Sequence, residues 1–170
     1  MQMSVKAELQ QELEATRLAY YELLAHVPDE AFPLPSGNLA WNIGEVLYHM
    51  SIAPRMIGAD VRMITSQNWI YRWLAVLVPE RLFNWLNARM TRFGARHMSR
   101  DFLAQSYNRA NEAACQALAS IPEGDFSRGL DYPDWDPMLT GEVTLERLFR
   151  YLKLHFEHHA AEIRDQLAVE

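Results

Sequence analysis

The sequence has little of what marks several large protein classes. Its one cysteine, Cys115, excludes an internal disulfide framework, and it lies among good helix formers where a small buried residue is expected. No apolar run approaches the roughly 18 residues that a membrane-spanning helix needs. The first residues lack an apolar stretch after a basic start, so no signal peptide is predicted. We therefore expect a cytoplasmic protein.

Basic residues are also scarce relative to acidic ones. The chain has 16 Lys and Arg against 22 Asp and Glu, a formal net charge of -6 at pH 7. This balance argues against a general nucleic-acid binder, which normally carries a basic surplus. Apolar residues make up 49% of the chain and charged residues 22%, which is an ordinary globular composition. We expect one domain over residues 1–170, because this length can bury a core of its own.

Period-two alternation and hairpin turns are absent, so the sequence predicts no sheet. Four segments instead combine good helix formers with helical periodicity. We expect helices over residues 4–26, 38–65, 99–120 and 144–168, separated by loops that include residues 28–37 and 123–141. Ser99 and Thr144 are candidate N-caps, and Pro54 should kink the second helix. The pattern predicts an all-α four-helix bundle.

A long insertion, residues 66–98, separates the second and third helices. It is too long for a tight turn, so it predicts a helical crossover that leaves these two helices parallel. Its second part leads into five arginines with no acidic residue between them: Arg81, Arg89, Arg92, Arg96 and Arg100. The last four have spacings that place them near one helical face. This face fits a solvated surface, a homodimer contact, an anion-binding rim or a membrane-surface helix, the last disfavoured by the acidic chain.

The first part of the insertion is aromatic and apolar. The segment from Trp69 to Val78, together with Phe83 and Trp85, offers more large apolar surface than a crossover needs. Aromatic residues and arginine are enriched in the cores of protein interfaces. We therefore expect this segment to cover one end of the bundle and to contribute to a homodimer contact.

Three of the six histidines fall within five residues of the last predicted helix. Bundle helices bury positions that alternate three and four apart. One such series runs through Leu145, Leu148, Leu152, His155, His159 and Glu162. His155 and His159 should therefore face the interior, one turn apart, whereas His158 should face solvent or the edge of the bundle.

The second predicted helix also places a histidine inward. Its expected apolar stripe consists of Leu39, Ile43, Val46, Ala53 and Ile57, and His49 falls on the same stripe. A buried histidine is often a hydrogen-bonded core residue, but three of them need partners for every ring nitrogen. A divalent metal is a common partner for all three, and a facial set of ligands leaves positions open for water or substrate. The remaining histidines, His26 and His97, have no such setting and are read as structural.

Other catalytic motifs are missing. The run from His155 to His159 lacks the glutamate that a zincin helix needs after its first histidine, and no phosphate loop, nucleophile elbow or di-iron signature is present. Glu45 lies one turn before His49, and Glu162 lies three residues after His159. Either could orient a ligand or accept a proton, but a solvated side chain or a helix ion pair is the expected role. The sequence names no catalytic acid or base.

Two motifs resemble those of the DinB-like superfamily. The first is Trp41-Asn-Ile-Gly-Glu-Val-Leu-Tyr-His49, and the second leads from Thr144-Leu-Glu-Arg-Leu-Phe to His155-Phe-Glu-His-His159-Ala-Ala-Glu-Ile163. The resemblance implies an up-down-down-up bundle with one divalent metal on three histidines, here His49, His155 and His159. Characterised relatives include thiol-cofactor-dependent S-transferases and a maleylpyruvate isomerase. The family often has Gln-Ile where this chain has Glu162-Ile163, and the insertion of residues 66–98 is longer than usual.

These observations predict a metal-dependent enzyme that acts on a small molecule. A low-molecular-weight thiol is the leading cofactor or co-substrate, and transfer of a sulfur-linked group is the leading reaction. Hydrolysis by a metal-activated hydroxide and a non-enzymatic metal-binding or small-molecule-binding module are the alternatives. Zinc and nickel both accept three imidazoles, and iron does so as well, so the residues do not name the metal.

Overall fold

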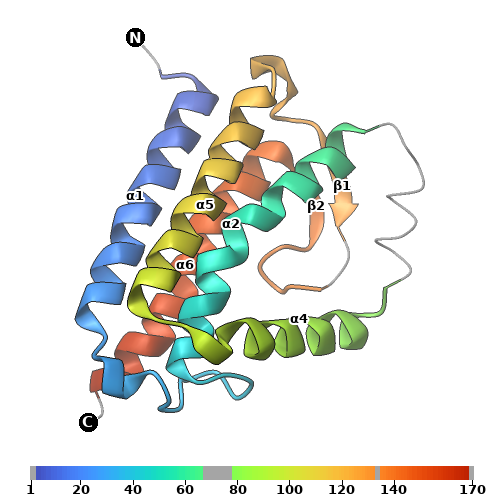
Figure 1. Ribbon diagram of the computed structural model, residues 1–170. Coiled ribbons are helices and arrows are strands. Elements are labelled where there is room, and N and C mark those ends of the chain that lie inside the picture. The colour runs from blue at the N-terminus through green and yellow to red at the C-terminus, as the bar shows by residue number, and fades with distance from the viewer. Residues whose placement is uncertain (1–2, 67–77, 133–134, 169–170) are drawn as a thin grey trace.

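The computed structural model describes residues 3–66, 78–132 and 135–168 (Figure 1). Most of these residues are helical, and the remainder includes two short strands and three 3-10 turns. The elements in chain order are α1 (Val5–His26), η1 (Asp29–Ala31), α2 (Ile43–Thr65), α4 (Glu80–Gly94), η2 (Ala95–His97), α5 (Arg100–Ser120), η3 (Glu123–Asp125), β1 (Gly129–Tyr132), β2 (Gly141–Thr144) and α6 (Leu145–Ala168).

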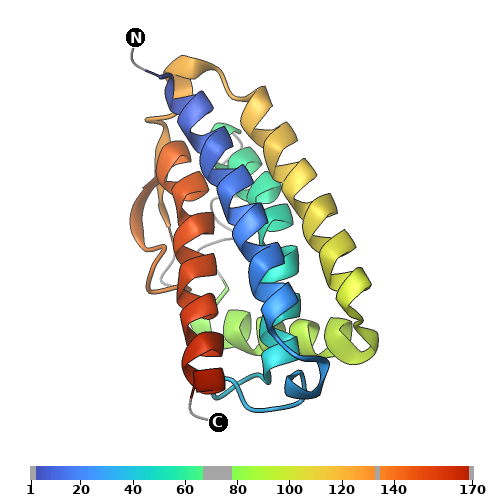
Figure 2. The ribbon, with the colours of Figure 1, turned by 90° about the vertical axis from the view of Figure 1, so that its left-hand side faces the viewer.

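Four helices form the bundle. Helix α1 packs against α5 and α6, and α2 packs against the same two helices. Figures 1 and 2 show that α2 and α5 run in one direction while α1 and α6 run in the other. This is the up-down-down-up arrangement expected from the sequence, and α4 lies in the crossover between the two parallel helices. None of the helices in the described parts of the chain is both long enough and apolar enough to cross a membrane.

Local capping explains where the helices begin. The side chains of Ser99 and Thr144 accept backbone N–H groups at the starts of α5 and α6, as expected. Helix α2 begins at Ile43 rather than near residue 38, because Asn42 and Glu45 form a reciprocal capping box. Pro54 lies inside α2, and the helix continues past it to Thr65.

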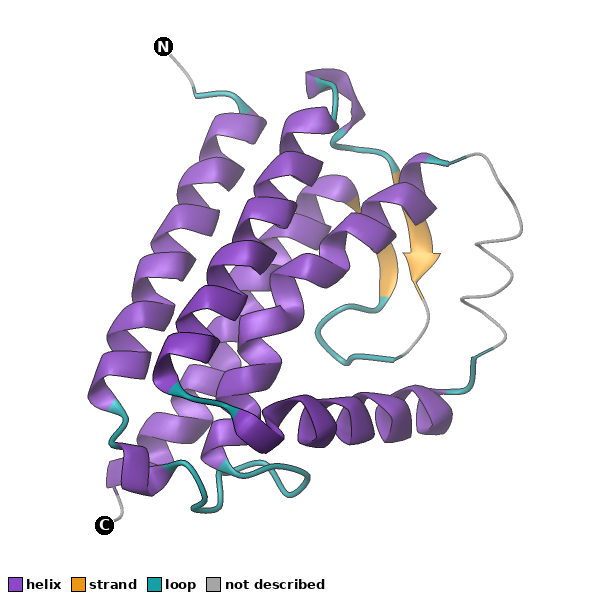
Figure 3. Cartoon of the chain, viewed as in Figure 1, coloured by secondary structure: helices purple, strands orange, loops and turns teal. Residues whose placement is uncertain are grey.

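The predicted loop at residues 123–141 contains strand structure, so the expectation of no sheet was wrong. Strands β1 and β2 pair antiparallel, with Leu130 opposite Val143 (Figure 3). Leu130 and Tyr132 are buried and alternate with exposed neighbours. A strand of four residues is too short for this alternation to stand out in the sequence. These strands depend instead on the packing of their buried side chains against the helices.

The core divides into two clusters along the bundle. One contains the second half of α2 and the first part of α6, up to Leu152. The other contains the first part of α2, up to Met50, and α6 from Phe156 onward. Leu39, which the sequence placed on the buried stripe of the second helix, is fully exposed and precedes α2. The inward histidines therefore lie at the level where the two apolar clusters divide.

The arginines of the insertion do not share one helix. Helix α4 ends at Gly94 and α5 begins at Arg100, so the expected single face breaks between them. Arg100 instead donates to the backbone carbonyl of Val27 and pairs with Asp29. The Trp69–Val78 segment, expected to cover one end of the bundle, lies outside the described residues except for its last position.

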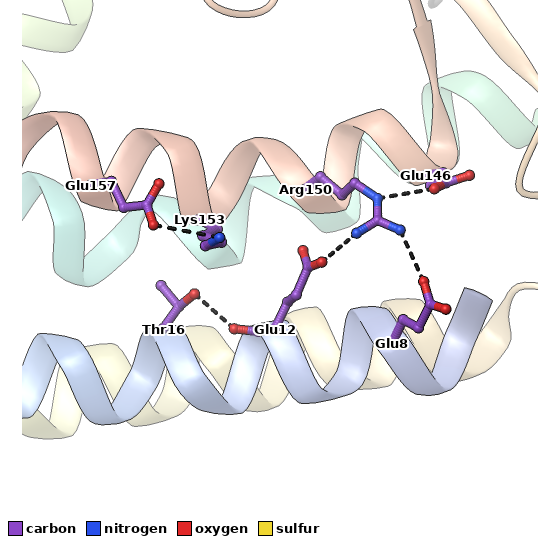
Figure 4. A network of polar contacts seen from close by, with 7 residues as sticks. All are labelled: Glu8, Glu12, Thr16, Glu146, Arg150, Lys153 and Glu157. Carbon is purple, nitrogen blue, oxygen red and sulfur yellow. Dashed lines mark hydrogen bonds and ion pairs between the residues drawn. The ribbon is translucent and has the colours of Figure 1, made fainter. Parts of the chain in front are cut away.

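An ion-pair network joins α1 to the outer side of α6 (Figure 4). The guanidinium of Arg150 contacts the carboxylates of Glu8 and Glu12 from α1 and of Glu146 from its own helix. All four side chains are between 29% and 39% exposed. The network therefore sits at the surface, where water screens each pair.

Candidate metal centre

Three histidine side chains meet between α2 and α6. His49 comes from α2, and His155 and His159 come from successive turns of α6. One ring nitrogen from each lies within 4.8 Å of the other two. The Nε2 atoms of His49 and His155 are 2.9 Å apart. The structure thus brings together the three histidines that helical spacing placed on the interior faces.

Burial keeps these imidazoles neutral. His155 and His159 are 5% and 6% exposed. Burial, and to a smaller extent the nearby imidazole of His159, lowers the pKa of His49 to about 3. Burial, followed by the neighbouring His49 and His159, lowers the pKa of His155 well below 6.5. The pKa of His159 is lowered as well, mainly by burial and against the opposing hydrogen bond to Glu162. At neutral pH all three side chains are in the form that binds metals.

Glu162 orients His159. The sequence favoured a solvated side chain or a helix ion pair for this residue and offered orientation of a ligand as the alternative. The Nδ1 atom of His159 lies 2.7 Å from the Glu162 carboxylate. A carboxylate accepts only, so Nδ1 carries the proton and Nε2 is left as the electron-pair donor. His158 is exposed, with its Nε2 3.4 Å from the other Glu162 oxygen. Glu45, the other candidate, serves instead in the capping box of α2.

Two aromatic rings border the histidines. The indole of Trp41 lies 4.6 Å from the His49 ring, measured between centroids. The phenol ring of Tyr151 lies 5.4 Å from the ring of His155. Trp41 belongs to the first motif singled out in the sequence, and Tyr151 lies one turn before His155 on α6. Each of the two rings therefore packs beside one of the imidazoles.

Two partly buried acid–phenol pairs near this site could not be recognised in the sequence. Tyr151 donates its hydroxyl hydrogen bond to Asp136 at 2.5 Å, and Tyr132 donates to Asp60 at 2.8 Å. Burial raises the pKa of Asp60 to about 6, although the Tyr132 hydrogen bond opposes the shift. Asp136 sits in the β1–β2 connection, where no periodicity marks it. Tyr151 precedes His155 by four residues, and this helical spacing could have pointed to it.

The spacing of the nitrogens and the carboxylate behind His159 fit a bound metal ion, whereas the surroundings of His49 do not. Nitrogens that are each about 2.0–2.1 Å from one ion lie roughly 2.9 Å apart at right angles and roughly 3.4 Å apart in a tetrahedron. The observed 2.9 Å between His49 and His155 falls in this range. The carboxylate behind His159 is the usual outer partner of a ligating histidine. By contrast, Nδ1 of His49 is enclosed and has no partner within the described residues.

The other histidines do not join the cluster. His26 is exposed, and its Nδ1 lies 2.6 Å from the carbonyl oxygen of Glu22 in the same helix. His97 is exposed in η2. Within the described residues, a second group with metal-binding spacing consists of His158, His159 and Glu162, and it shares His159 with the first.

Comparisons with known proteins agree with this architecture. Residues 12–163 match the profile of the DinB superfamily. Among solved structures, the chain is similar to the crystal structure of the mycothiol-dependent maleylpyruvate isomerase, with a TM-score of 0.64 and 12% sequence identity. The match covers 95% of this chain and 63% of that one, so this chain spans less than two thirds of its length. At this identity the likeness concerns the fold alone. No curated protein matches the chain.

Proposed function

Because the chain belongs to the DinB superfamily, we propose that it is a metal-dependent enzyme that holds one divalent ion on His49, His155 and His159. The observation that carries the proposal is the meeting of three neutral, largely buried imidazoles from two helices. Burying several imidazoles is costly unless each nitrogen finds a partner, and one ion is a partner for all three. Zinc or nickel suits nitrogen ligands best, and iron is the next choice.

The residues around the histidines have separate tasks in this proposal. A bound divalent ion supplies positive charge that lowers the pKa of a thiol or a water molecule beside it. Glu162 holds the proton of His159 on Nδ1 and fixes the direction of its other nitrogen. Trp41 and Tyr151 exclude solvent from two of the imidazoles, which strengthens electrostatic interactions at the site. Asp136 holds the Tyr151 phenol in place from the hairpin connection.

We propose a low-molecular-weight thiol as the co-substrate and a small organic molecule as its partner. Family membership and the mycothiol-dependent neighbour support a thiol, because a thiolate is both a strong nucleophile and a good metal ligand. Transfer of a sulfur-linked group is the reaction that follows from this chemistry. Hydrolysis by an activated water is the second candidate, and it is favoured by the same open positions on three neutral ligands. A binding module without catalysis is the third.

A thiol titration separates these candidates. Protein loaded with nickel or cobalt should develop a thiolate-to-metal charge-transfer band when a small thiol such as cysteamine is added. The His158→Ala variant should give the same band, because His158 points outward, whereas His159→Ala should give none. A metal-loaded protein that responds to no small thiol would refute the thiol-dependent function and leave hydrolysis or binding alone.

We also propose that the protein acts as a homodimer, with α4 and the β1–β2 hairpin at the contact.

A further inference from the structure

Helix α4 exposes an unusual amount of apolar surface. Leu82, Trp85, Leu86, Met90 and Phe93 are 45%, 56%, 41%, 64% and 69% exposed. At about 100° per residue, all of these residues except Trp85 fall within about 80° of the helix circumference. Trp85 lies at one edge of this stripe. Single exposed apolar residues are normal, but a continuous stripe of them indicates an interaction surface.

Arginines lie beside this stripe on α4 and η2. They are Arg81, Arg89, Arg92 and Arg96, all exposed, and none pairs with a carboxylate in the described parts of the chain. Arg89 lies over the Trp85 ring and Arg96 over the Phe93 ring, at 5.7 and 5.1 Å from the centroids. Arginine, aromatic residues and methionine, without lysine, are the composition enriched in the cores of protein interfaces.

The hairpin carries an opposite charge that is also uncompensated. Asp131 and Glu142 are exposed and directly opposite each other in the β1–β2 ladder. Like charges in this position destabilise a strand pair. The nearby Arg147 uses its guanidinium on the backbone carbonyls of Thr140 and Glu142. No ion pair to either carboxylate is found among the described residues.

The basic helix and the acidic hairpin adjoin each other. Figure 1 shows both on the side of the bundle that faces away from α1. The rings of Phe83 on α4 and Trp135 in the hairpin connection are stacked, with centroids 4.7 Å apart. One side of the molecule therefore has a positive half, a negative half and an apolar stripe on the positive half.

We propose that this side binds a second copy of the chain about a two-fold axis. Such an axis makes each surface meet itself in reverse, so the α4 arginines of each copy face Asp131 and Glu142 of the other. Outside residues 81–100, which hold five arginines and no acidic residue, eleven basic residues stand against 22 acidic ones. This acidic remainder of the chain is repelled by an anionic membrane, whereas it is attracted by the arginines of a second copy. The contact would also fix the position of α4. This helix is tied to the metal site, because its Arg92 donates a hydrogen bond to the carbonyl of Ala40, the residue before Trp41.

A charge-swap experiment tests the pairing. The helix variant carries Arg81→Glu and Arg89→Glu, and the hairpin variant carries Asp131→Arg and Glu142→Arg. Each variant alone should dimerise at least about 10-fold more weakly than the wild type, because like charges now face each other. An equimolar mixture should recover dimers, since each variant then meets opposite charges at both contacts. Sedimentation velocity over a concentration series measures all of these states.

A matched charge reversal elsewhere, metal content and the helical fold serve as controls. Arg109→Glu reverses an exposed charge on α5, outside both α4 and the hairpin, and should leave dimerisation unchanged. Metal content should be the same in all these variants, so failure of the dimer would not count against the metal site. Each variant is checked by far-UV circular dichroism for an intact helical fold.

The expected result is a wild-type dimer that both reversed variants weaken and that their mixture restores. A wild type that stays monomeric at every concentration would overturn the proposal. So would reversed variants that dimerise like the wild type, or a mixture that does not recover. Binding of the wild type to phosphatidylglycerol vesicles, without dimers, would assign the α4 face to a membrane and overturn it equally.

Discussion

The polar groups on the two sides of α6 differ in charge and in exposure to solvent. On the outer side, Arg150 meets three carboxylates, and all four side chains are partly exposed (Figure 4). On the inner side, His155 and His159 face His49 in a neutral and largely buried group. The outer charges have both partners and water. The inner nitrogens have each other and one carboxylate.

This difference indicates which of the two groups needs a ligand. The Arg150 network is complete within the chain, and screened pairs of this kind each contribute about 0–1 kcal/mol. The histidine group has one carboxylate for three imidazoles, and the 2.9 Å between the Nε2 atoms of His49 and His155 fits two ligands of one ion. Unpartnered buried polar atoms reduce stability, so a group of this kind is retained where it serves a function. The outer side of α6 is therefore complete without a ligand, whereas the inner side is not.

Removal of the metal should have the largest effect. An ion present at about 1,000 times its dissociation constant adds about 4 kcal/mol to the free energy of unfolding. A chelator should therefore lower the melting temperature of the wild type clearly. The His159→Ala variant should melt at the same temperature with and without the chelator. An identical melting temperature for wild type before and after chelation would contradict the inner side's need for a ligand.

Loss of Glu162 should weaken the metal without abolishing binding. Glu162→Ala should lower metal affinity about 10–100-fold, because His159 loses the acceptor that fixes its proton on Nδ1. Glu162→Gln should have a smaller effect, since the amide oxygen can still accept that hydrogen bond. Competition with a chromophoric chelator measures the affinities. His158→Ala is the matched control and should bind like the wild type.

The metal-free protein should become less stable in acid because the fold holds the buried histidines neutral. The unfolded chain protonates His49 near pH 6.5, but the fold holds its pKa at about 3. The unfolded state therefore binds more protons between these values, and stability falls as the pH drops through this window. The His49 substitution should remove a loss of about 3 kcal/mol in the free energy of unfolding between pH 7 and pH 4.

Urea denaturation from pH 7 to pH 4 compares wild type with His49→Asn. Asp60 has the opposite slope, because its pKa is raised to about 6 and its stabilising contribution is lost as the pH rises. That contribution is common to both proteins and cancels in the difference. Parallel curves for the two proteins would show that His49 is not held neutral by the fold.

Disruption of the outer network should have the smallest effect. Arg150→Ala should lower the free energy of unfolding by about 1 kcal/mol or less, and added salt should reduce the difference further. Metal content should remain that of the wild type, because Arg150 lies on the opposite side of α6 from the histidines. A metal content that falls with Arg150 would show that the two sides are not independent.

The interior placement of the histidines could be predicted because it depends on a local period. Apolar residues three and four apart define one side of a helix, and His155 and His159 continue that series whereas His158 does not. The structure accordingly has His159 buried and His158 exposed. The role of His49, His155 and His159 as metal ligands stays a prediction.

The missed features depend on contacts that no period records. Leu130 and Tyr132 form a strand through pairing with residues further along the chain, and four residues carry too little alternation to reveal it. Asp136 approaches Tyr151 only because the hairpin connection folds back onto α6. The start of α2 moved to Ile43 because one side-chain capping box outweighs several residues of moderate helix propensity.

Metal analysis of four single-alanine variants tests the central claim most directly. Purified wild type and His158→Ala should each contain about one divalent ion per chain, as a mononuclear site requires. His49→Ala, His155→Ala and His159→Ala should each contain almost none, while far-UV circular dichroism confirms that the helices persist. Wild-type metal content in the His159 variant, or loss of metal from the His158 variant, would contradict the site proposed between α2 and α6.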